Sequence, residues 1–325
     1  MTDKTLLIGD IGGTNARFAL ADPEQPGFYD VMKLKCADFV SADAAIRHYL
    51  DDVSAGSPDI ICLAGAGPVM DEVIKLTNNH WILDAVSMRA EFDIDAVHLL
   101  NDFEAVAYSI SELQENDLQS IGMPERKLLP VDKFNIAIIG AGTGFGVAGL
   151  IRRANALIPI VGEGGHIGFA PKSKIQLELL SILSNDFDRI NLDRLVCGPG
   201  IEIIYSALAL IYGEQRAQLS AKEIFTESHK GSDPLAFETV DIFFEILGQV
   251  SGDIALCMGA TDGVYLAGGI AKRYPILLQN SKFRSAFESK DRQHAYMERI
   301  PTLLITQDDP GLLGAANCAL KLSSS

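Results

Sequence analysis

Hydrophobic and polar positions along the chain follow two periodicities, and each predicts elements of a different kind. Residues 5–9 and 17–21 are short apolar runs on either side of a turn at Gly12 and Gly13, which predicts a β-hairpin. Residues 41–53 carry apolar side chains at helical spacing, which predicts a helix with one buried face. The chain is therefore expected to begin with a hairpin and a helix that covers a sheet.

The same patterns continue through the first third of the chain. Residues 59–64, 69–76 and 96–100 are rich in strand-forming residues and are predicted strands. Asp84 is a suitable cap for a short helix, and residues 103–113 are predicted to be helical. Strands and helices thus alternate, as in an α/β fold.

The polar stretch 114–127 contains a glycine and a proline and is predicted to connect two lobes. A chain of 325 residues is also longer than one compact core usually supports. We therefore expect a small α/β domain over residues 1–112 and a large α/β domain over residues 113–307. A last helix in residues 308–325 is expected to pack back on the small domain.

The strand, glycine turn and strand at the start of the chain recur in its second half. Residues 8–20 read Ile-Gly-Asp-Ile-Gly-Gly-Thr-Asn-Ala-Arg-Phe-Ala-Leu, and residues 139–150 read Ile-Gly-Ala-Gly-Thr-Gly-Phe-Gly-Val-Ala-Gly-Leu. Such internal similarity predicts two related lobes, with both turns pointing into one cleft. Further on, a predicted helix at 241–259 and a predicted strand at 264–267 continue the alternating architecture.

Composition and charge exclude several classes of partner. The formal net charge is −16, which disfavours binding to nucleic acid and to anionic membranes. The five cysteines are scattered without a C-x-x-C pair, which indicates a reducing compartment such as the cytoplasm, and the N-terminus predicts no signal peptide. The uncharged stretch between Lys133 and Arg152 contains several glycines, which favour a turn between strands over a membrane helix.

The two glycine turns are candidate phosphate-binding sites. In the first, backbone N–H groups of Gly12 and Gly13 can approach phosphate oxygens closely, and Thr14 adds a hydroxyl donor. Asp10 is placed to hold a phosphate-bound Mg²⁺, usually through water. An ordinary β-turn with a favourable aspartate is the alternative. The second turn, with Thr143 between two glycines, repeats the composition and favours the phosphate-binding hypothesis.

A dinucleotide-binding motif is a rival interpretation of the second turn. Glycines that follow an apolar strand resemble G-x-G-x-x-G, and Glu163 lies about where a ribose-binding acid would fall. Counted from Gly140, however, the third glycine would fall at Phe145. The N-terminal hairpin also has no role in a nicotinamide-dependent dehydrogenase, and no P-loop motif occurs.

Asn101 and Asp102 stand where a predicted strand meets a predicted helix. Asn and Asp are preferred helix caps, so a structural role is one interpretation. In the other, Asp102 is a general base that accepts the proton of an attacking hydroxyl during phosphoryl transfer. We favour the second interpretation.

Glu163 and His166 flank a pair of glycines and offer an acceptor and a donor or acceptor side by side. This composition suits paired hydrogen bonds to vicinal hydroxyls, although a lone histidine on an apolar strand is more often structural. No further ligands at metal spacing accompany them, so a metal site is not predicted here.

Taken together, these motifs resemble the bacterial glucokinase family, ATP-dependent hexokinases of the actin-like superfamily. The similar segments, in order, are residues 9–17, 76–81, 101–103, 140–146, 162–166, 198–200, 266–270 and 310–314. The resemblance implies a two-lobed α/β, ribonuclease H-like fold with a nucleotide and sugar cleft between the lobes. It also implies transfer of the γ-phosphoryl group of ATP to the 6-hydroxyl of glucose, with Mg²⁺.

The resemblance assigns roles to residues that match the family motifs. Asp102 would activate the 6-hydroxyl, and the sugar would be bound by Asn101, Asp102, Glu163, His166 and Asp193. The nucleotide would be bound by Gly9, Asp10, Ile11, Gly12, Gly13, Thr14, Gly142, Thr143, Gly144, Gly268 and Gly269, with the last two near adenosine. A homodimer is expected by analogy with relatives.

One position departs from the family pattern. Asp193 stands five residues before Gly198, where the family usually has Glu, so the carboxylate arm is one methylene shorter. This bears on the contact expected at the anomeric hydroxyl, and hence on the preference for glucose over other hexoses. Two alternatives to a kinase stay open, a non-catalytic sugar sensor on the same fold and the dehydrogenase considered above.

Overall fold

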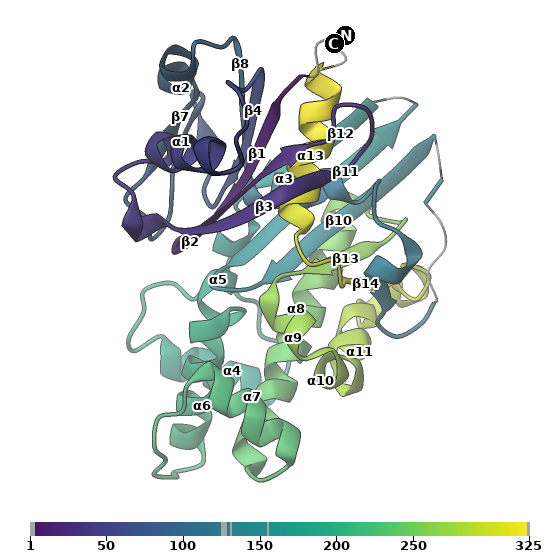
Figure 1. Ribbon diagram of the computed structural model, residues 1–325. Coiled ribbons are helices and arrows are strands. Elements are labelled where there is room, and N and C mark those ends of the chain that lie inside the picture. The colour runs from purple at the N-terminus through teal and green to yellow at the C-terminus, as the bar shows by residue number, and fades with distance from the viewer. Residues whose placement is uncertain (1–3, 125–128, 131, 155, 324–325) are drawn as a thin grey trace. The chain divides into compact units, whose positions relative to one another are not determined.

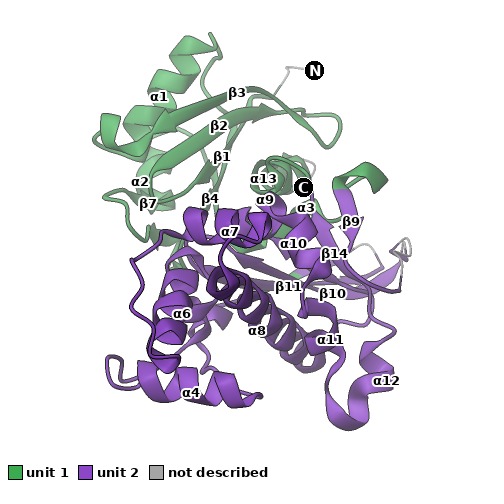
Figure 2. Cartoon of the chain, turned by 90° about the horizontal axis from the view of Figure 1, so that it is seen from below, with its two compact units in different colours: residues 1–117, 159–161, 307–325 green, residues 118–158, 162–306 purple. Residues whose placement is uncertain are grey.

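The computed structural model describes residues 4–124, 129–130, 132–154 and 156–323, which form two compact units (Figures 1 and 2). Unit 1 consists of residues 1–117, 159–161 and 307–325, and unit 2 of residues 118–158 and 162–306. The chain passes into unit 2 after residue 117, returns to unit 1 for residues 159–161, and returns again for its last helix. Residues 125–127 of the predicted connecting stretch lie outside the described residues.

Unit 1 is built on a five-stranded sheet with the order β3-β2-β1-β4-β8. Strands β1 and β2 form the predicted hairpin, β3 continues it antiparallel, and β4 and β8 run parallel to β1. The strands span β1 Leu6–Ile11, β2 Asn15–Ala21, β3 Phe28–Lys35, β4 Ile60–Gly65 and β8 Ala96–Asn101. The hairpin at the N-terminus therefore lies at the centre of the sheet, beside two parallel strands.

Helices cover both faces of this sheet because alternate strand residues point to opposite sides. On β1, Leu7 and Ile11 belong to the core under α1 and α2, whereas Leu6 and Ile8 belong to the core with α13. In Figure 1, α13 is the yellow helix, and it packs against α3, β1 and β4. These helices are α1 Ala42–Asp52, α2 Ala85–Phe92, α3 Asp102–Ser109 and α13 Pro310–Ser323.

The prediction of one strand over residues 69–76 was wrong, because the chain turns back within it. A small sheet forms from β5 Val69–Met70, β6 Val73–Lys75 and β7 Ile82–Asp84. Asp71 and Glu72 between β5 and β6 both have positive φ, the geometry of a tight hairpin turn. An Asp-Glu pair is a weaker turn signal than Asp-Gly, so the pattern did not reveal it. Asp84 caps α2 as predicted.

Unit 2 repeats the strand order of unit 1 and adds one strand at an edge. Its sheet has the order β12-β11-β10-β13-β14-β9, in which β10 and β11 form the second predicted hairpin and β13 and β14 run parallel to β10. The strands are β9 Leu118–Ser120, β10 Lys133–Ala141, β11 Phe145–Arg153, β12 Ala156–Gly162, β13 Val264–Ala267 and β14 Thr302–Ile305. The duplicated hairpin motif thus heads two sheets of the same order.

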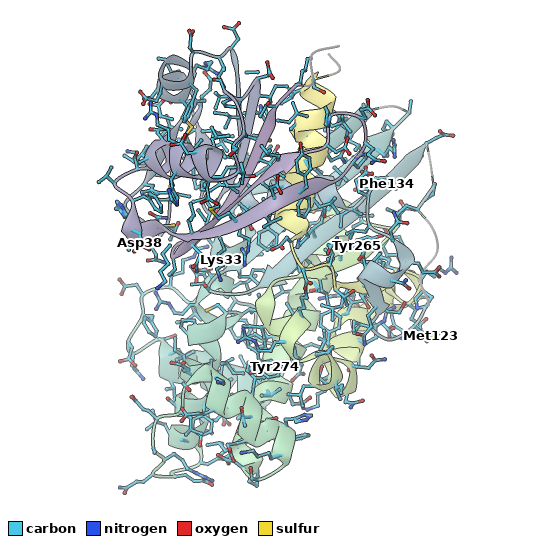
Figure 3. The ribbon with its side chains drawn as sticks, viewed as in Figure 1. Lys33, Asp38, Met123, Phe134, Tyr265 and Tyr274 are labelled. Carbon is cyan, nitrogen blue, oxygen red and sulfur yellow. The ribbon has the colours of Figure 1, made fainter. Side chains whose placement is uncertain are left out.

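In unit 2, the helices α6, α7 and α11 pack against the long helix α8. Phe134 on β10 and Tyr265 on β13 are buried, and Tyr274 stacks on Phe225 of α7 with ring centroids 4.1 Å apart (Figure 3). The helices are α4 Lys174–Leu183, α5 Leu192–Leu195, α6 Gly198–Ile211, α7 Ala221–Lys230, α8 Pro234–Met258, α9 Gly269–Arg273, α10 Pro275–Asn280, α11 Phe283–Glu288 and α12 His294–Met297.

Two predicted helix boundaries differ from the structure. The helix expected at 241–259 begins earlier, since Asp233 caps it and Pro234 occupies its first turn, and Gly259 ends it with φ 61°. The helix expected at 103–113 ends at Ser109, where the Ile110 amide bonds to Ala107 in a tighter turn. Among the described residues, no helix has the length and apolar character needed to span a membrane.

Candidate active site

In each unit, the predicted site residues gather at one edge of the sheet. In unit 1, Ile11, Gly65 and Asn101 are register partners across the parallel strands β1, β4 and β8. The turn after β1 and the start of α3 after β8 therefore lie at the same edge, where ligands bind in sheets of this kind. In unit 2, Gly140 and Ala267 are register partners, which places the turn after β10 beside Gly268.

The first glycine turn is held by hydrogen bonds from neighbouring segments. The Gly12 amide donates to the Asn15 carbonyl at 3.0 Å, and the Asn79 side chain donates to the Gly12 carbonyl at 3.0 Å. The Cys36 amide donates to the Thr14 carbonyl at 3.0 Å. The Gly12 amide, expected to face a phosphate, is thus engaged within the turn, and the Gly12 and Thr14 carbonyls accept from neighbouring segments. Asn79 lies within residues 76–81, one of the segments that resemble the family, and its side chain holds the turn through this hydrogen bond.

Asp10 belongs to a charged group that joins the hairpin to the start of α13. Arg17 is its register partner on β2, and the Arg17 guanidinium lies 3.5 Å from Asp10 and 3.2 Å from Asp309. Burial raises the pKa of Asp10, the positive charge of Arg17 opposes this rise, and the nearby Asp309 carboxylate adds to it. The Asp10 side chain keeps 26% of its surface exposed. Its carboxylate therefore stays accessible.

Some glycines of the site are required by the fold and others are not. A Cβ at Gly9 would lie 2.8 Å from Leu63, and a Cβ at Gly268, whose φ is 88°, would lie 2.4 Å from the Ala141 carbonyl. By contrast, a Cβ at Gly142 or Gly269 would have no atom within 4 Å, and one at Gly12 would have its nearest neighbour at 3.6 Å. None of these last three glycines has positive φ. At these three positions the fold leaves room for a ligand to approach the backbone closely.

The second glycine turn is anchored by Asp193. The Phe145 amide donates to Asp193 Oδ1 at 2.7 Å, and a Cβ at Gly144 would lie 2.7 Å from the same oxygen. The Gly198 amide also donates to the Gly142 carbonyl at 2.9 Å. Asp193 therefore has a structural role that the sequence did not indicate. A carboxylate accepts several hydrogen bonds, so this contact leaves capacity for a ligand hydroxyl.

Of the two roles weighed for Asn101 and Asp102, the structure shows the helix cap, and it belongs to Asn101. Asn101 is the N-cap of α3, and its side chain accepts from the Phe103 and Glu104 amides in a capping box with Glu104. Its side-chain amide also donates to the Gly67 carbonyl at 3.1 Å. Asp102 is the first helical residue and is half-buried, so its carboxylate is not the cap. The cap hypothesis holds for Asn101.

Glu163 and His166 border a short 3₁₀-helix, Gly164–His166, and both side chains are exposed. Nδ1 of His166 lies 3.2 Å from the side-chain nitrogen of Asn191, the N-cap of α5. The intervening Gly165 is buried, and a Cβ there would lie 2.3 Å from the Phe145 carbonyl. Tight backbone packing thus presents the two polar side chains at the surface of unit 2.

Four side chains with clear roles were absent from the predicted site: Asn79, Arg17, Asp309 and Asn191. Arg17 and Asn79 occurred only within quoted motifs. Asn191 carries a local signal, since it precedes Leu-Asp-Arg-Leu as a helix cap would. Its contact with His166 depends on chain pairing that no local pattern encodes.

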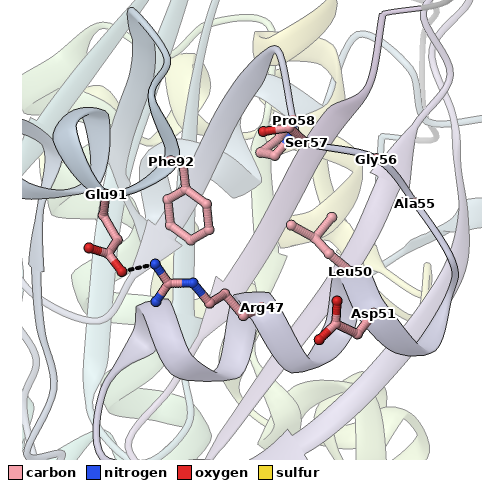
Figure 4. Close-up of a pocket in the computed structure, with 9 residues that line it drawn as sticks. All are labelled: Arg47, Leu50, Asp51, Ala55, Gly56, Ser57, Pro58, Glu91 and Phe92. Carbon is pink, nitrogen blue, oxygen red and sulfur yellow. Dashed lines mark hydrogen bonds and ion pairs between the residues drawn. The ribbon is translucent and has the colours of Figure 1, made fainter.

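A separate hollow of about 350 Å³ lies over α1 and α2 and includes none of the predicted site residues (Figure 4). Its wall contains an ion pair between Arg47 and Glu91, and the Arg47 guanidinium lies 5.5 Å from the centre of the Phe92 ring. The hollow is therefore the groove beside this surface ion pair. It contributes nothing to the candidate site.

Comparison with known proteins connects this geometry to a family. The glucokinase family model matches residues 7–322, and a glucokinase from Hahella chejuensis is 38% identical over 315 residues, covering 97% of this chain and 96% of the relative. The chain belongs to the glucokinase family. The prediction of an ATP-dependent sugar kinase from this family is thereby confirmed.

Solved structures confirm the fold class. The crystal structure of a glucokinase from an Antarctic psychrotroph has a TM-score of 0.87 at 34% identity and covers 99% of this chain and 100% of its own. A ROK family glucokinase from Streptomyces griseus, in complex with glucose and AMPPNP, has a TM-score of 0.66 at 18% identity over 98% of this chain and 99% of its own. The chain has the α/β, actin-like fold of sugar kinases.

Proposed function

We propose that this protein transfers the γ-phosphoryl group of ATP to the 6-hydroxyl of glucose, giving glucose 6-phosphate and ADP. The observation that carries the proposal is the open space at Gly12, Gly142 and Gly269. Glycines that the fold does not require, on turns at the carboxyl edges of two related sheets, suit a ligand whose oxygens approach the backbone. Among its relatives, the Streptomyces griseus protein binds glucose and an ATP analogue.

For the nucleotide, the proposal uses backbone groups of Gly9 to Thr14, with a parallel role for Gly142, Thr143 and Gly144. Gly9 and Ile11 are buried in β1 between β2 and β4, so they are proposed to contribute through the backbone and not through side chains. Gly268 and Gly269 are proposed to border adenosine. Asp10 fits a phosphate-bound Mg²⁺, because its accessible carboxylate offers the oxygen ligands that this cation prefers. Bound there, Mg²⁺ would neutralise charge on the transferred phosphoryl group.

For the sugar, we propose that Asp102 accepts the proton of the 6-hydroxyl as its oxygen attacks phosphorus. The N-cap of α3 is Asn101, and Asp102 is the first residue of the helix beside it. Asn101, Glu163, His166 and Asp193 are proposed to bind the remaining hydroxyls. Such positioning holds the attacking oxygen in line and supplies much of the rate enhancement of a kinase.

The test is ADP release by purified protein with Mg-ATP and, in parallel, glucose, mannose, fructose, N-acetylglucosamine or no sugar. Release that requires glucose, with glucose 6-phosphate as the product, supports the proposal. Release with another hexose instead of glucose keeps the proposed kinase mechanism but changes the sugar. Asp193 is then a candidate cause of the different sugar preference. If no sugar stimulates release, the proposal is wrong and the sensor hypothesis takes its place.

Gly142 and Gly144 provide a matched pair of variants for the nucleotide site. In Gly142→Ala the added methyl group meets no protein atom, so we expect unchanged thermal stability and a KM for ATP raised about tenfold or more. In Gly144→Ala the methyl group displaces Asp193, so we expect a loss of about 1–3 kcal/mol in the free energy of unfolding. Thermal unfolding and ATP titrations measure both. A Gly142→Ala enzyme with unaltered KM for ATP would contradict the phosphate-binding role.

Location and assembly stay predictions. The cysteines at positions 36, 62, 197, 257 and 318 are free thiols in the structure, which suits the cytoplasm. A homodimer is proposed from the family resemblance alone. Light scattering of the purified protein at several concentrations checks it.

A further inference from the structure

The hydrogen bonds of Asn191 permit only one orientation of its side-chain amide. Its Oδ1 accepts from the Arg194 backbone amide at 3.0 Å as the N-cap of α5. A backbone N–H can only donate, so the atom facing it must be the carbonyl oxygen of the side-chain amide. The NH₂ group of Asn191 therefore points away from α5.

This orientation determines the tautomer of His166. The Asn191 NH₂ group lies 3.2 Å from Nδ1 of His166, and an amide nitrogen donates but does not accept. Nδ1 must then offer its lone pair, which leaves the ring hydrogen on Nε2. The N–H donor of His166 then lies on the side of the ring opposite Asn191.

The backbone holds these two residues together. The Phe169 amide donates to the Ile190 carbonyl at 3.0 Å, and the Leu192 amide donates to the Ile167 carbonyl at 3.2 Å. These bonds form an antiparallel bridge in which Gly168 pairs with Asn191. The segment that carries His166 and the segment that carries Asn191 cannot separate without breaking this bridge. The bridge therefore keeps the side chains of His166 and Asn191 within reach of one another.

We propose that Asn191 is a positioning residue that fixes His166 as a hydrogen-bond donor to a sugar hydroxyl. The proposal rests on the sugar-binding function proposed above. It adds Asn191 to that site and states that His166 donates its hydrogen bond to the sugar. Glu163, which is exposed on the same short segment, accepts hydrogen bonds as a carboxylate. One acceptor and one fixed donor together fit two hydroxyls, of which one donates to Glu163 and the other accepts from His166.

The α5 turn also connects the two parts of the site in unit 2. Asn191 orients His166, and Asp193 two residues later accepts from the Phe145 amide at the end of the second glycine turn. Both contacts depend on the first turn of α5. A change at Asn191 that keeps the helix cap should alter His166 while leaving the glycine turn in place.

Asn191→Asp is such a change, because Asp caps helices as well as Asn does. Its carboxylate accepts from Arg194 and also from Nδ1–H of His166, so the ring hydrogen moves to Nδ1 or the ring becomes protonated. We expect glucose affinity, measured by calorimetry without ATP, to fall about tenfold. Asn185→Asp, which adds the same charge at an exposed site in unit 2, should bind glucose like the unmodified protein.

Two measurements separate positioning from a merely structural role. The ¹⁵N NMR shifts of the His166 ring, assigned with His166→Ala, should report hydrogen on Nε2 in the unmodified protein and a changed state in Asn191→Asp. In the His166→Ala background, Asn191→Asp should cause no further loss of glucose affinity. Hydrogen on Nδ1 in the unmodified protein, or an equal loss in both backgrounds, overturns the proposal. If no sugar binds at all, the proposed function fails, whereas the NMR result still decides the tautomer.

Discussion

Asp102→Asn is expected to lower kcat for glucose phosphorylation about 10²- to 10⁴-fold, the usual contribution of a general base. Asparagine has the same shape and can still accept the hydrogen bond that Asp102 Oδ1 receives from the Phe103 amide at 2.9 Å. It cannot take a proton from the attacking hydroxyl. The midpoint of thermal unfolding should change by no more than about 2 °C, and the glucose dissociation constant should change little. Steady-state kinetics and calorimetry test the three expectations together.

Glu104→Gln is the matched control for Asp102→Asn, because it removes a carboxylate from the same helical turn. Glu104 accepts from the Asn101 amide at 3.4 Å in the capping box. Its loss should cost about 0.5–1 kcal/mol of stability and leave kcat within a few-fold. If Asp102→Asn retained kcat within tenfold while Glu104→Gln lost activity, the capping box and not a general base would account for this region.

The sequence was sufficient for the elements whose signals are local. Each glycine hairpin combined apolar strands with a turn, and the same order recurred in both halves, so both hairpins and the similarity of the two lobes could be predicted. The helix caps at Asp84 and at the start of α3 were similarly visible as polar residues before apolar runs. The β5–β6 turn was missed because Asp71 and Glu72 adopt positive φ without a glycine.

The parts of the site that could not be predicted depend on contacts between distant segments. Asp309 reaches Arg17 only because α13 returns to the first hairpin at the end of the chain. His166 meets Asn191 through a bridge between irregular segments that have no strand pattern. Asp193 was expected to contact the sugar, and its bond to the Phe145 amide depends on the position of α5. Motifs predicted which residues carry chemistry, but not which residues hold them in place.

The close packing of α13 on unit 1 gives the largest expected effect on stability, at Gly314. A Cβ at Gly314 would lie 1.6 Å from the Ala105 carbonyl oxygen and 3.1 Å from the Ser109 amide nitrogen, both in α3. Backbone atoms of a helix cannot move aside as a flexible side chain can, so the helices must separate. We expect Gly314→Ala to lower the free energy of unfolding by about 3 kcal/mol or more, measured by urea denaturation.

Gly56→Ala is the matched control for Gly314→Ala in the same unit, because its Cβ would have no atom within 4 Å. Gly56 does not have positive φ, so this change should leave the free energy of unfolding unaltered or raise it by about 0.4–1 kcal/mol. Gly314→Ala should also reduce kcat in the protein that stays folded, since α3 begins at Asp102 and α13 carries Gly311 against Asp10. Stability equal to that of Gly56→Ala would mean that α13 does not approach α3 this closely, and the support of Asp102 would then have to come from the capping box alone.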